Sequence, residues 1–267
     1  MATTAQAAAL TAAYLAATNQ QGALAAYVVA QLWLRAIDLN DIDASAAKLT
    51  ARLIPLIRQQ QDKTRALARE YYPAFRRLET GRSDGFSLPA LGELDLPSLE
   101  TSLRVTGPVA LKKRISKIAA EPGSVLERSM LSQAMDDTAT GLSGAATRHV
   151  MNGGRDEIQN ALKQDTLALG YVRNTQGDPC YFCAMLASRG PVYDDDSFDE
   201  SDPRFIGEGE HKVHDHCRCT VEPVYSRKSK WPGVASEASQ MWGDLSKSLG
   251  RVPTINDWRG AWNDRAR

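Results

Sequence analysis

The chain has 267 residues, of which 43% are apolar and 24% charged, and lysine plus arginine equals aspartate plus glutamate at 32 each. This length allows one large domain or two small ones with a hydrophobic core. The charge balance excludes a strongly basic nucleic-acid-binding surface over the whole chain, but it does not exclude local basic patches. The alanine-rich N-terminus lacks a basic region and polar residues 18–21 interrupt it, so it resembles neither a secretory signal nor a membrane span.

Residues 1–80 predict a long antiparallel helical hairpin. Apolar residues recur at helical spacing over residues 5–37, and the expected buried stripe consists of Leu24, Tyr27, Val28, Leu32 and Trp33. A second helix is expected to run to residue 80, kinked or divided at Pro55 because proline removes a backbone donor. Its aromatic cluster at residues 71–75 is interpreted as packing rather than as a platform for nucleic-acid bases.

Residues 81–97 are rich in glycine, proline and serine and lose the helical period, so this stretch is expected to be a linker. Beyond it, residues 98–225 are expected to form the main domain. Its helices are predicted over residues 98–119, around a break at Gly107-Pro108, and over residues 124–152. Gly153-Gly154 is interpreted as the C-terminal stop of that helix, with a further helix over residues 155–163.

A small sheet is expected in the second half of this domain. Residues 170–174 and 219–225 have strand character, and residues 180–188 between them could form a short helix. The remaining residues, 226–267, are expected to be a linker and a helical tail whose Trp258 and Trp262 dock on the domain or a partner. The fold class is therefore mainly α with a small β-sheet (α+β).

Residues 177–225 contain all four cysteines and three of the four histidines. Cys180 and Cys183 form a C-x-x-C knuckle, and His214, Cys217 and Cys219 form an H-x-x-C-x-C cluster. Thiolates and imidazole in a tetrahedral arrangement select zinc. The sequence predicts one structural zinc ion held by Cys180, Cys183 and Cys217. Either His214 or Cys219 is the fourth ligand.

Other interpretations of these residues stay open. A redox C-x-x-C or two disulfides would use the same cysteines, and a catalytic Cys–His pair could use His211, His214, His216 and Asp215. The acidic carboxylates at residues 194–199 could bind calcium, but a solvated loop is favoured because the EF-hand spacing is absent. His149 is interpreted as a hydrogen-bonded buried histidine unless the fold places it beside His216.

The segments GDPCYFCAMLASRGPVY and HDHCRCTVEPVY resemble the Mu F-like (MuF) head-morphogenesis family of bacteriophages, in the branch found in phages of actinobacteria. The shared signature is a C-x-x-C, a variable loop, H-x-x-C-R-C and a following proline, here Pro223. The upstream segments TSLRVTGPVALKKRI and ATRHVMNGGRDEI resemble the same branch. Asp215-His216 departs from that pattern, in which a proline often follows the first histidine.

The resemblance implies a minor capsid protein that is assembled in the host cytoplasm and built into the phage head interior near the portal. It implies portal, major capsid or scaffolding proteins as partners, with packaged DNA as a further candidate and no membrane. Proteins of this branch are often labelled capsid maturation protease. An enzyme is not the favoured interpretation, because no G-x-S-x-G or H-E-x-x-H motif is present; a nucleic-acid-binding or nuclease module is a weaker alternative.

Overall fold

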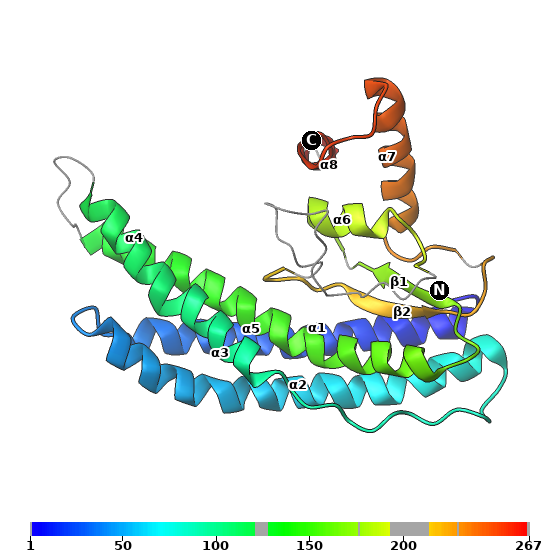
Figure 1. Ribbon diagram of the computed structural model, residues 1–267, viewed down its shortest axis with the longest axis horizontal. Coiled ribbons are helices and arrows are strands. Elements are labelled where there is room, and N and C mark those ends of the chain that lie inside the picture. The colour runs from blue at the N-terminus through cyan, green and yellow to red at the C-terminus, as the bar shows by residue number, and fades with distance from the viewer. Residues whose placement is uncertain (1, 121–127, 176, 193–213, 229, 266–267) are drawn as a thin grey trace.

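The computed structural model describes residues 2–120, 128–175, 177–192, 214–228 and 230–265. It confirms the predicted fold class, since the described residues form helices and one two-stranded antiparallel sheet. Three long helices, α1 (Ala5–Ala36), α2 (Ile42–Thr80) and α5 (Arg128–Gln164), run side by side along the long axis (Figure 1). The sheet and three short helices lie on one side of these helices.

Helices α1 and α2 form the expected hairpin. The side chain of Thr4 caps the start of α1, and that of Asp41 caps the start of α2. The predicted break at Pro55 is wrong as a division, because α2 continues through Pro55 and also through Pro73. Leu53 and Ile57, on either side of the exposed Pro55, are both buried in the core. This packing supports the helix across the lost backbone hydrogen bond.

The buried face of α1 differs from the predicted stripe. It consists mainly of residues spaced by three or four positions, among them Tyr14, Thr18, Gly22, Ala25, Val29 and Trp33. Leu24 and Tyr27, expected to be buried, are 45% and 65% exposed. The prediction weighted large apolar residues, whereas α5 packs against small ones: a Cβ atom on Gly22 would lie 3.3 Å from Thr147 Cγ2.

Helix α5 runs unbroken through Gly153-Gly154, so the predicted stop is wrong. These glycines allow close approach of neighbouring helices instead. A Cβ atom on Gly153 would lie 2.6 Å from the backbone oxygen of Gln61 on α2, and one on Gly154 would lie 2.6 Å from Tyr14 Oη on α1. Glycine is therefore required here by the packing of three helices rather than by a turn.

Gly153→Ala is expected to destabilise the protein by up to about 2 kcal/mol. Overpacking costs about 1–3 kcal/mol, and the better helix propensity of alanine returns up to about 1 kcal/mol. The matched control is Gly243→Ala in α7 (Ala235–Leu249), where nothing lies within 4 Å of an added Cβ atom. Urea unfolding should show that the control gains stability while Gly153→Ala loses it. If both variants lose stability, or if neither does, the packing argument is contradicted.

The expected break at Gly107-Pro108 is present as a π-helical turn. Helix α3 (Leu96–Arg104) leads through η1 (Val105–Val109) into α4 (Ala110–Ala119). Gly107 departs from helical backbone angles and lies close to the ring of Trp33, to which an added Cβ atom would be 3.2 Å away. This turn brings α3 and α4 onto the core formed by α1, α2 and α5.

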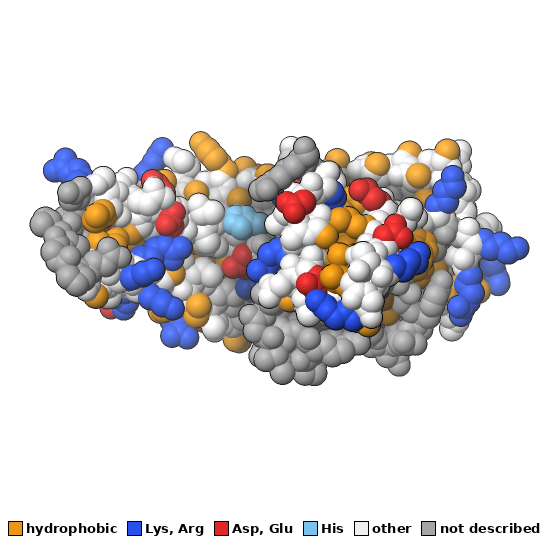
Figure 2. Space-filling model, turned by 90° about the horizontal axis from the view of Figure 1, so that it is seen from above, with side chains coloured by type: hydrophobic (Ala, Val, Ile, Leu, Met, Phe, Trp, Pro, Cys, Tyr) orange, Lys and Arg blue, Asp and Glu red, His pale blue; other side chains and the backbone are white. Residues whose placement is uncertain are grey.

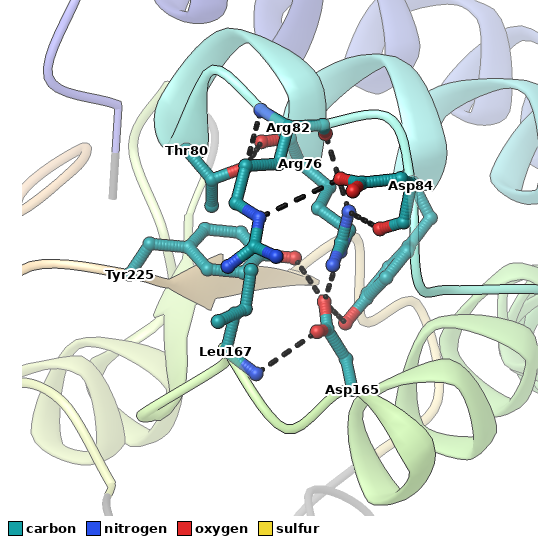
Figure 3. A network of polar contacts seen from close by, with 8 residues as sticks. Arg76, Thr80, Arg82, Asp84, Asp165, Leu167 and Tyr225 are labelled. Carbon is teal, nitrogen blue, oxygen red and sulfur yellow. Dashed lines mark hydrogen bonds and ion pairs between the residues drawn. The ribbon is translucent and has the colours of Figure 1, made fainter.

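A buried ionic network joins the end of α2 to the region after α5 (Figure 3). Asp165, whose side chain is 1% exposed, accepts hydrogen bonds at Oδ2 from Arg76 Nε at 3.1 Å, Tyr225 Oη at 2.8 Å and Tyr72 Oη at 3.2 Å. Its Oδ1 accepts from the backbone N–H of Leu167 at 3.1 Å. The carboxylate is thus fully hydrogen-bonded, as a buried charge must be.

The aromatic residues at the end of α2 are core residues, as predicted. Tyr71, Tyr72 and Phe75 are at most 2% exposed, and the ring of Tyr71 stacks on that of Tyr14 with centroids 4.5 Å apart. They belong to the same hydrophobic cluster as Cys183, Cys217 and Cys219. The thiols are therefore continuous with the core of the helical bundle.

Strands β1 (Gly170–Asn174) and β2 (Thr220–Val224) confirm the expected sheet, with Val172 opposite Glu222 in an antiparallel register. Helix α6 (Tyr181–Ala187) lies beside β1, and α7 and α8 (Ile255–Asp264) pack on α6 (Figure 1). The tail tryptophans dock on the domain, since Trp258 and Trp262 are 0% and 1% exposed.

Acidic and basic side chains are interspersed on the face that carries α6, α7 and α8 (Figure 2). The basic run in α4 is tied to acidic neighbours in part: Lys112 Nζ lies 2.6 Å from Asp43 Oδ1, and Arg114 Nε lies 3.7 Å from Asp137 Oδ2. No helix in the described parts of the chain has the length and apolar character needed to cross a bilayer.

Candidate metal centre

The two cysteine pairs, far apart in the sequence, meet in the structure. The Sγ atoms of Cys183 and Cys217 are 3.7 Å apart, and His214 Nε2 lies 3.0 Å from Cys180 Sγ and 3.2 Å from Cys183 Sγ. The candidate ligands form two groups of three (triplets), and within each triplet all ligand atoms lie within 4.8 Å of one another. Cys183 belongs to both triplets. One triplet also contains Cys180 and His214, and the other contains Cys217 and Cys219. All five predicted ligands thus come together around Cys183.

The separation of the two sulfurs fits a zinc ion. A Zn–S bond of about 2.3 Å in tetrahedral geometry places two sulfurs about 3.8 Å apart, which agrees with 3.7 Å between Cys183 and Cys217. All four cysteines are free thiols in the structure, and this separation is far longer than the roughly 2.0 Å of a disulfide bond. The thiol and imidazole donors are those that zinc prefers.

The first pair is positioned by α6. Cys180 is the N-cap residue, and its Sγ accepts a hydrogen bond from the backbone N–H of Cys183 at 3.4 Å. The knuckle follows β1, as a redox C-x-x-C does. However, β1 pairs antiparallel with β2, and the described residues form no parallel βαβ unit, which a thioredoxin-like site would have.

The second group lies on a tight turn that rests on α5. Cys217 N donates to His214 O at 3.0 Å, and His216 occupies the left-handed region with φ 62°. His216 N donates to Gly144 O at 3.1 Å, and a Cβ atom on Gly144 would lie 2.5 Å from the His216 ring. Glycine at position 144 therefore allows the turn to reach α5.

Arg155 on α5 holds the C-x-C backbone in place. It is 1% exposed and donates from Nη2 to Cys217 O and from Nε to Cys219 O, both at 2.9 Å. Its Nη1 donates to Asn152 Oδ1 at 2.7 Å on the same helix. One buried side chain thereby connects two candidate ligands to the helical bundle.

The local electrostatics favour the thiolate, the form of cysteine that binds metals, at Cys180 and Cys217. A hydrogen bond from the Cys183 thiol lowers the pKa of Cys180 to about 4, with His214 contributing. The pKa of Cys217 is also well below its usual range, first through the hydrogen bond with Cys183 and then through Cys219, with further help from the charges of Arg155 and Arg173.

The pKa of Cys183 is raised well above its usual range, first by the hydrogen bond with Cys180 and then by that with Cys217. The hydrogen bond with Cys183 lowers the pKa of Cys219, but the hydrogen bond with Cys217 and burial outweigh it and raise that pKa to about 12. Two of the four thiols are thus prepared for ligation, and the other two would lose their protons on binding the metal.

His214 is oriented with Nε2 toward the thiols. Its Nδ1–H donates to the carbonyl oxygen of Asp215 at 2.6 Å, an arrangement typical of metal-binding histidines. Burial alone would lower its pKa, but the hydrogen bond with Cys180 and the nearby thiolates outweigh burial and raise the pKa to about 9. In the metal-free protein the imidazole is therefore protonated, and ligation requires it to lose that proton.

His149 is a buried, hydrogen-bonded histidine, as predicted. Its Nε2 lies 2.9 Å from Ser102 Oγ on α3, and burial, followed by the charge of Arg148, lowers its pKa to about 4. Arg148 also donates to Ser102 Oγ at 2.9 Å and pairs with Asp215 Oδ1 at 3.0 Å. The ring of His216 lies against Gly144 instead, so the two histidines have different partners.

Some predicted residues cannot be placed. His211 and the carboxylates at residues 194–199 lie outside the described residues. Conversely, the roles of Arg155, Gly144 and Ser102 were not predicted from the sequence. The only clue to Arg155 is that it directly follows the packing glycines Gly153-Gly154, and no local pattern pointed to the other two.

Comparison with known proteins identifies relatives among phage proteins. A family described as VG15 protein matches residues 1–242. The Gene 15 protein of Mycobacterium phage D29 is 31% identical over 157 residues, and the match covers 47% of this chain and 55% of that protein. The match thus spans little more than half the length of this curated relative. No solved structure is matched.

Proposed function

The chain belongs to the VG15 protein family, a phage protein family, and we propose that it is a virion protein with a structural zinc ion. Within this reading we propose a MuF-like minor capsid protein that acts in head morphogenesis. The observation that carries the zinc site is the convergence of two distant thiol pairs, with Cys183 and Cys217 sulfurs 3.7 Å apart. The resemblance in residues 177–225 supports the head-morphogenesis role.

The proposed ion is held by Cys180, Cys183 and Cys217 together with His214 or Cys219. When bound, zinc would supply four bonds that cross-link α6 to the segment before β2 and so contribute directly to folding. The chain's own residues prepare the site: Arg155 fixes the second group, and α6 fixes the first.

His214 is the better supported fourth ligand. Its Nε2 lies 3.0 Å and 3.2 Å from the Sγ atoms of Cys180 and Cys183, and the hydrogen bond to the Asp215 carbonyl fixes the ring. Cys219 is 3% exposed and is placed next to Cys183 and Cys217 in the other triplet. A structural site needs four ligands, so one of the five donors would remain outside the coordination sphere.

The proposed partners are the portal and the major capsid or scaffolding proteins, and packaged DNA is a further candidate. The hairpin of residues 1–80 is the proposed docking element and residues 98–225 the proposed head-morphogenesis domain. Helix α1 has no charged residue before Arg35 and exposes Leu24, Tyr27 and Leu34. Monomeric proteins rarely leave large apolar surfaces uncovered, so this outer face favours a protein partner.

The location in the virion can be tested by quantitative mass spectrometry of purified procapsids and mature heads of the encoding phage. The proposal predicts the chain in both particles at a few copies, far below the major capsid protein. Its restriction to the soluble fraction of infected cells, with none in either particle, would contradict a virion role.

A capsid maturation protease is the second candidate, favoured by the close pair of Cys180 and His214. Cys180 is the exposed thiol of the four, and a Cys–His contact is the core of a cysteine hydrolase. Incubating the purified chain with its major capsid protein distinguishes the two functions. A defined cleavage that Cys180→Ser abolishes would establish the protease, whereas an uncleaved capsid protein supports the structural role.

A further inference from the structure

Helix α8 packs directly against the C-x-x-C knuckle. Trp258 and Trp262 are buried in a small cluster with Phe182, Met185 and Leu186 of α6. The match to the VG15 family ends at residue 242, before this helix begins. The contacts of α8 therefore indicate its role.

The two indole N–H groups bind the backbone on both sides of Cys180. Trp262 Nε1 donates to the carbonyl of Pro179 at 3.0 Å, and Trp258 Nε1 donates to the carbonyl of Tyr181 at 2.7 Å. Buried indole donors need such partners, so the contacts fix both the position of α8 and the path of the chain through Cys180.

Arg259 of α8 and its C-cap residue Arg265 reinforce this contact. Arg265 pairs with Asp178, and its guanidinium lies 3.5 Å from the centroid of the Trp262 ring. Arg259 donates to Tyr181 Oη at 2.6 Å and lies 4.5 Å from the centroid of the Tyr181 ring. Three side chains of α8 and that of its C-cap residue Arg265 thus hold residues 178–181; we call this set the α8 clamp.

The clamp acts on the ligand with the least support from the core. Cys183, Cys217 and Cys219 are buried and belong to the main hydrophobic cluster, whereas Cys180 is exposed. Its position depends on the N-terminus of α6, and α8 binds the residues on either side of it. Groups that orient a metal ligand from outside the coordination sphere control affinity as well as geometry.

We propose that the α8 clamp positions Cys180 for zinc, so that docking of the C-terminal helix and retention of the ion support each other. The inference rests on the proposed zinc site. Because coupling between two binding events is reciprocal, loosening the clamp weakens zinc retention, and removing zinc loosens α8. Trp258 and Trp262 are positioning residues, and neither contacts the ion.

The test uses the full chain loaded with zinc, and compares Trp258→Phe and Trp262→Phe with Trp242→Phe. Phenylalanine keeps an aromatic ring but removes the hydrogen bond to the knuckle. Transfer of zinc to a chromogenic chelator should become about threefold to tenfold faster in the first two variants, the range expected for one lost hydrogen bond. Trp242 packs on the Trp258 ring with centroids 5.3 Å apart, so its variant controls for lost volume in the same cluster.

Circular dichroism establishes that each variant is folded before release is measured. A zinc-loaded wild type with release rates unchanged in Trp258→Phe and Trp262→Phe would overturn the clamp and leave the zinc site standing. Equal acceleration in all three variants would also overturn it, because packing alone would then explain the effect. A wild type without bound zinc would overturn the proposed site itself.

Discussion

Cys183→Ser is expected to abolish zinc binding and to unfold the residues around the site while the long helices remain. Cys183 is the thiol shared by both ligand triplets, and it is 3% exposed within the main core cluster. Removing an outer-shell partner already costs roughly 10–100-fold in metal affinity, so loss of this central ligand should cost more.

The measurement is the zinc content after gel filtration, combined with limited proteolysis located by mass spectrometry. We expect zinc to fall from one ion per chain to none, with new cuts in residues 170–192 and 214–225 but not in α1 or α2. Thr220→Ser is the matched control: it changes a buried residue beside Cys219 without removing a thiol. A variant that keeps its zinc and resists cleavage would refute the shared-ligand role of Cys183.

Arg155→Leu is expected to destabilise the protein by about 2–6 kcal/mol. The carbonyl oxygens of Cys217 and Cys219 would lose their buried donor, and each unsatisfied group costs about 1–3 kcal/mol. The C-x-C segment would also separate from α5, so zinc affinity should fall together with stability. The effect exceeds that of an ordinary surface substitution because nothing in this buried position can replace the guanidinium.

Urea unfolding followed by circular dichroism measures this loss. Arg128→Leu, at the exposed start of α5, makes the same chemical change on the same helix and should stay within about 0.5 kcal/mol of the wild type. The loss of stability in Arg155→Lys should lie between those of Arg128→Leu and Arg155→Leu, because lysine can donate to only one of the two carbonyls at a time. A loss below about 1 kcal/mol for Arg155→Leu would mean that the segment does not depend on this contact.

Much of the fold could be predicted because its helices and strands carry strong local patterns. The strand expected at residues 170–174 matches β1 in extent, and the helical tail expected within residues 226–267 contains α7 and α8. The errors occurred where glycine has a packing role. Gly153-Gly154 has the appearance of a helix stop, yet it lies against Gln61 and Tyr14, and a single sequence does not reveal which distant helix will approach.

The buried face of α1 was misjudged for a related reason. Large apolar residues suggested that Leu24 and Tyr27 face the core, but the core side uses Gly22 and Ala25, which allow α5 to come close. Hydrophobic periodicity ranks residues by size and polarity. It does not register that a close helix–helix contact favours the smallest side chains.

The candidate site was predictable as a set of ligands but not as an environment. The C-x-x-C and H-x-x-C-x-C spacings identified the five donors that meet around Cys183. Arg155, Gly144 and the α8 clamp were not predicted, because each acts through a partner more than 60 residues away in the chain. Local spacing predicts which atoms can bind a metal, whereas tertiary packing decides what holds those atoms in place.

Zinc K-edge X-ray absorption spectroscopy on the purified full chain tests the central claim most directly. The account predicts one zinc ion per chain in a four-coordinate shell, with three sulfurs at about 2.3 Å and one nitrogen at about 2.0 Å, or four sulfurs if Cys219 replaces His214. A chain purified in the presence of zinc that holds none, with all four thiols open to alkylation, would contradict it. A bound ion surrounded only by oxygen and nitrogen would contradict it equally.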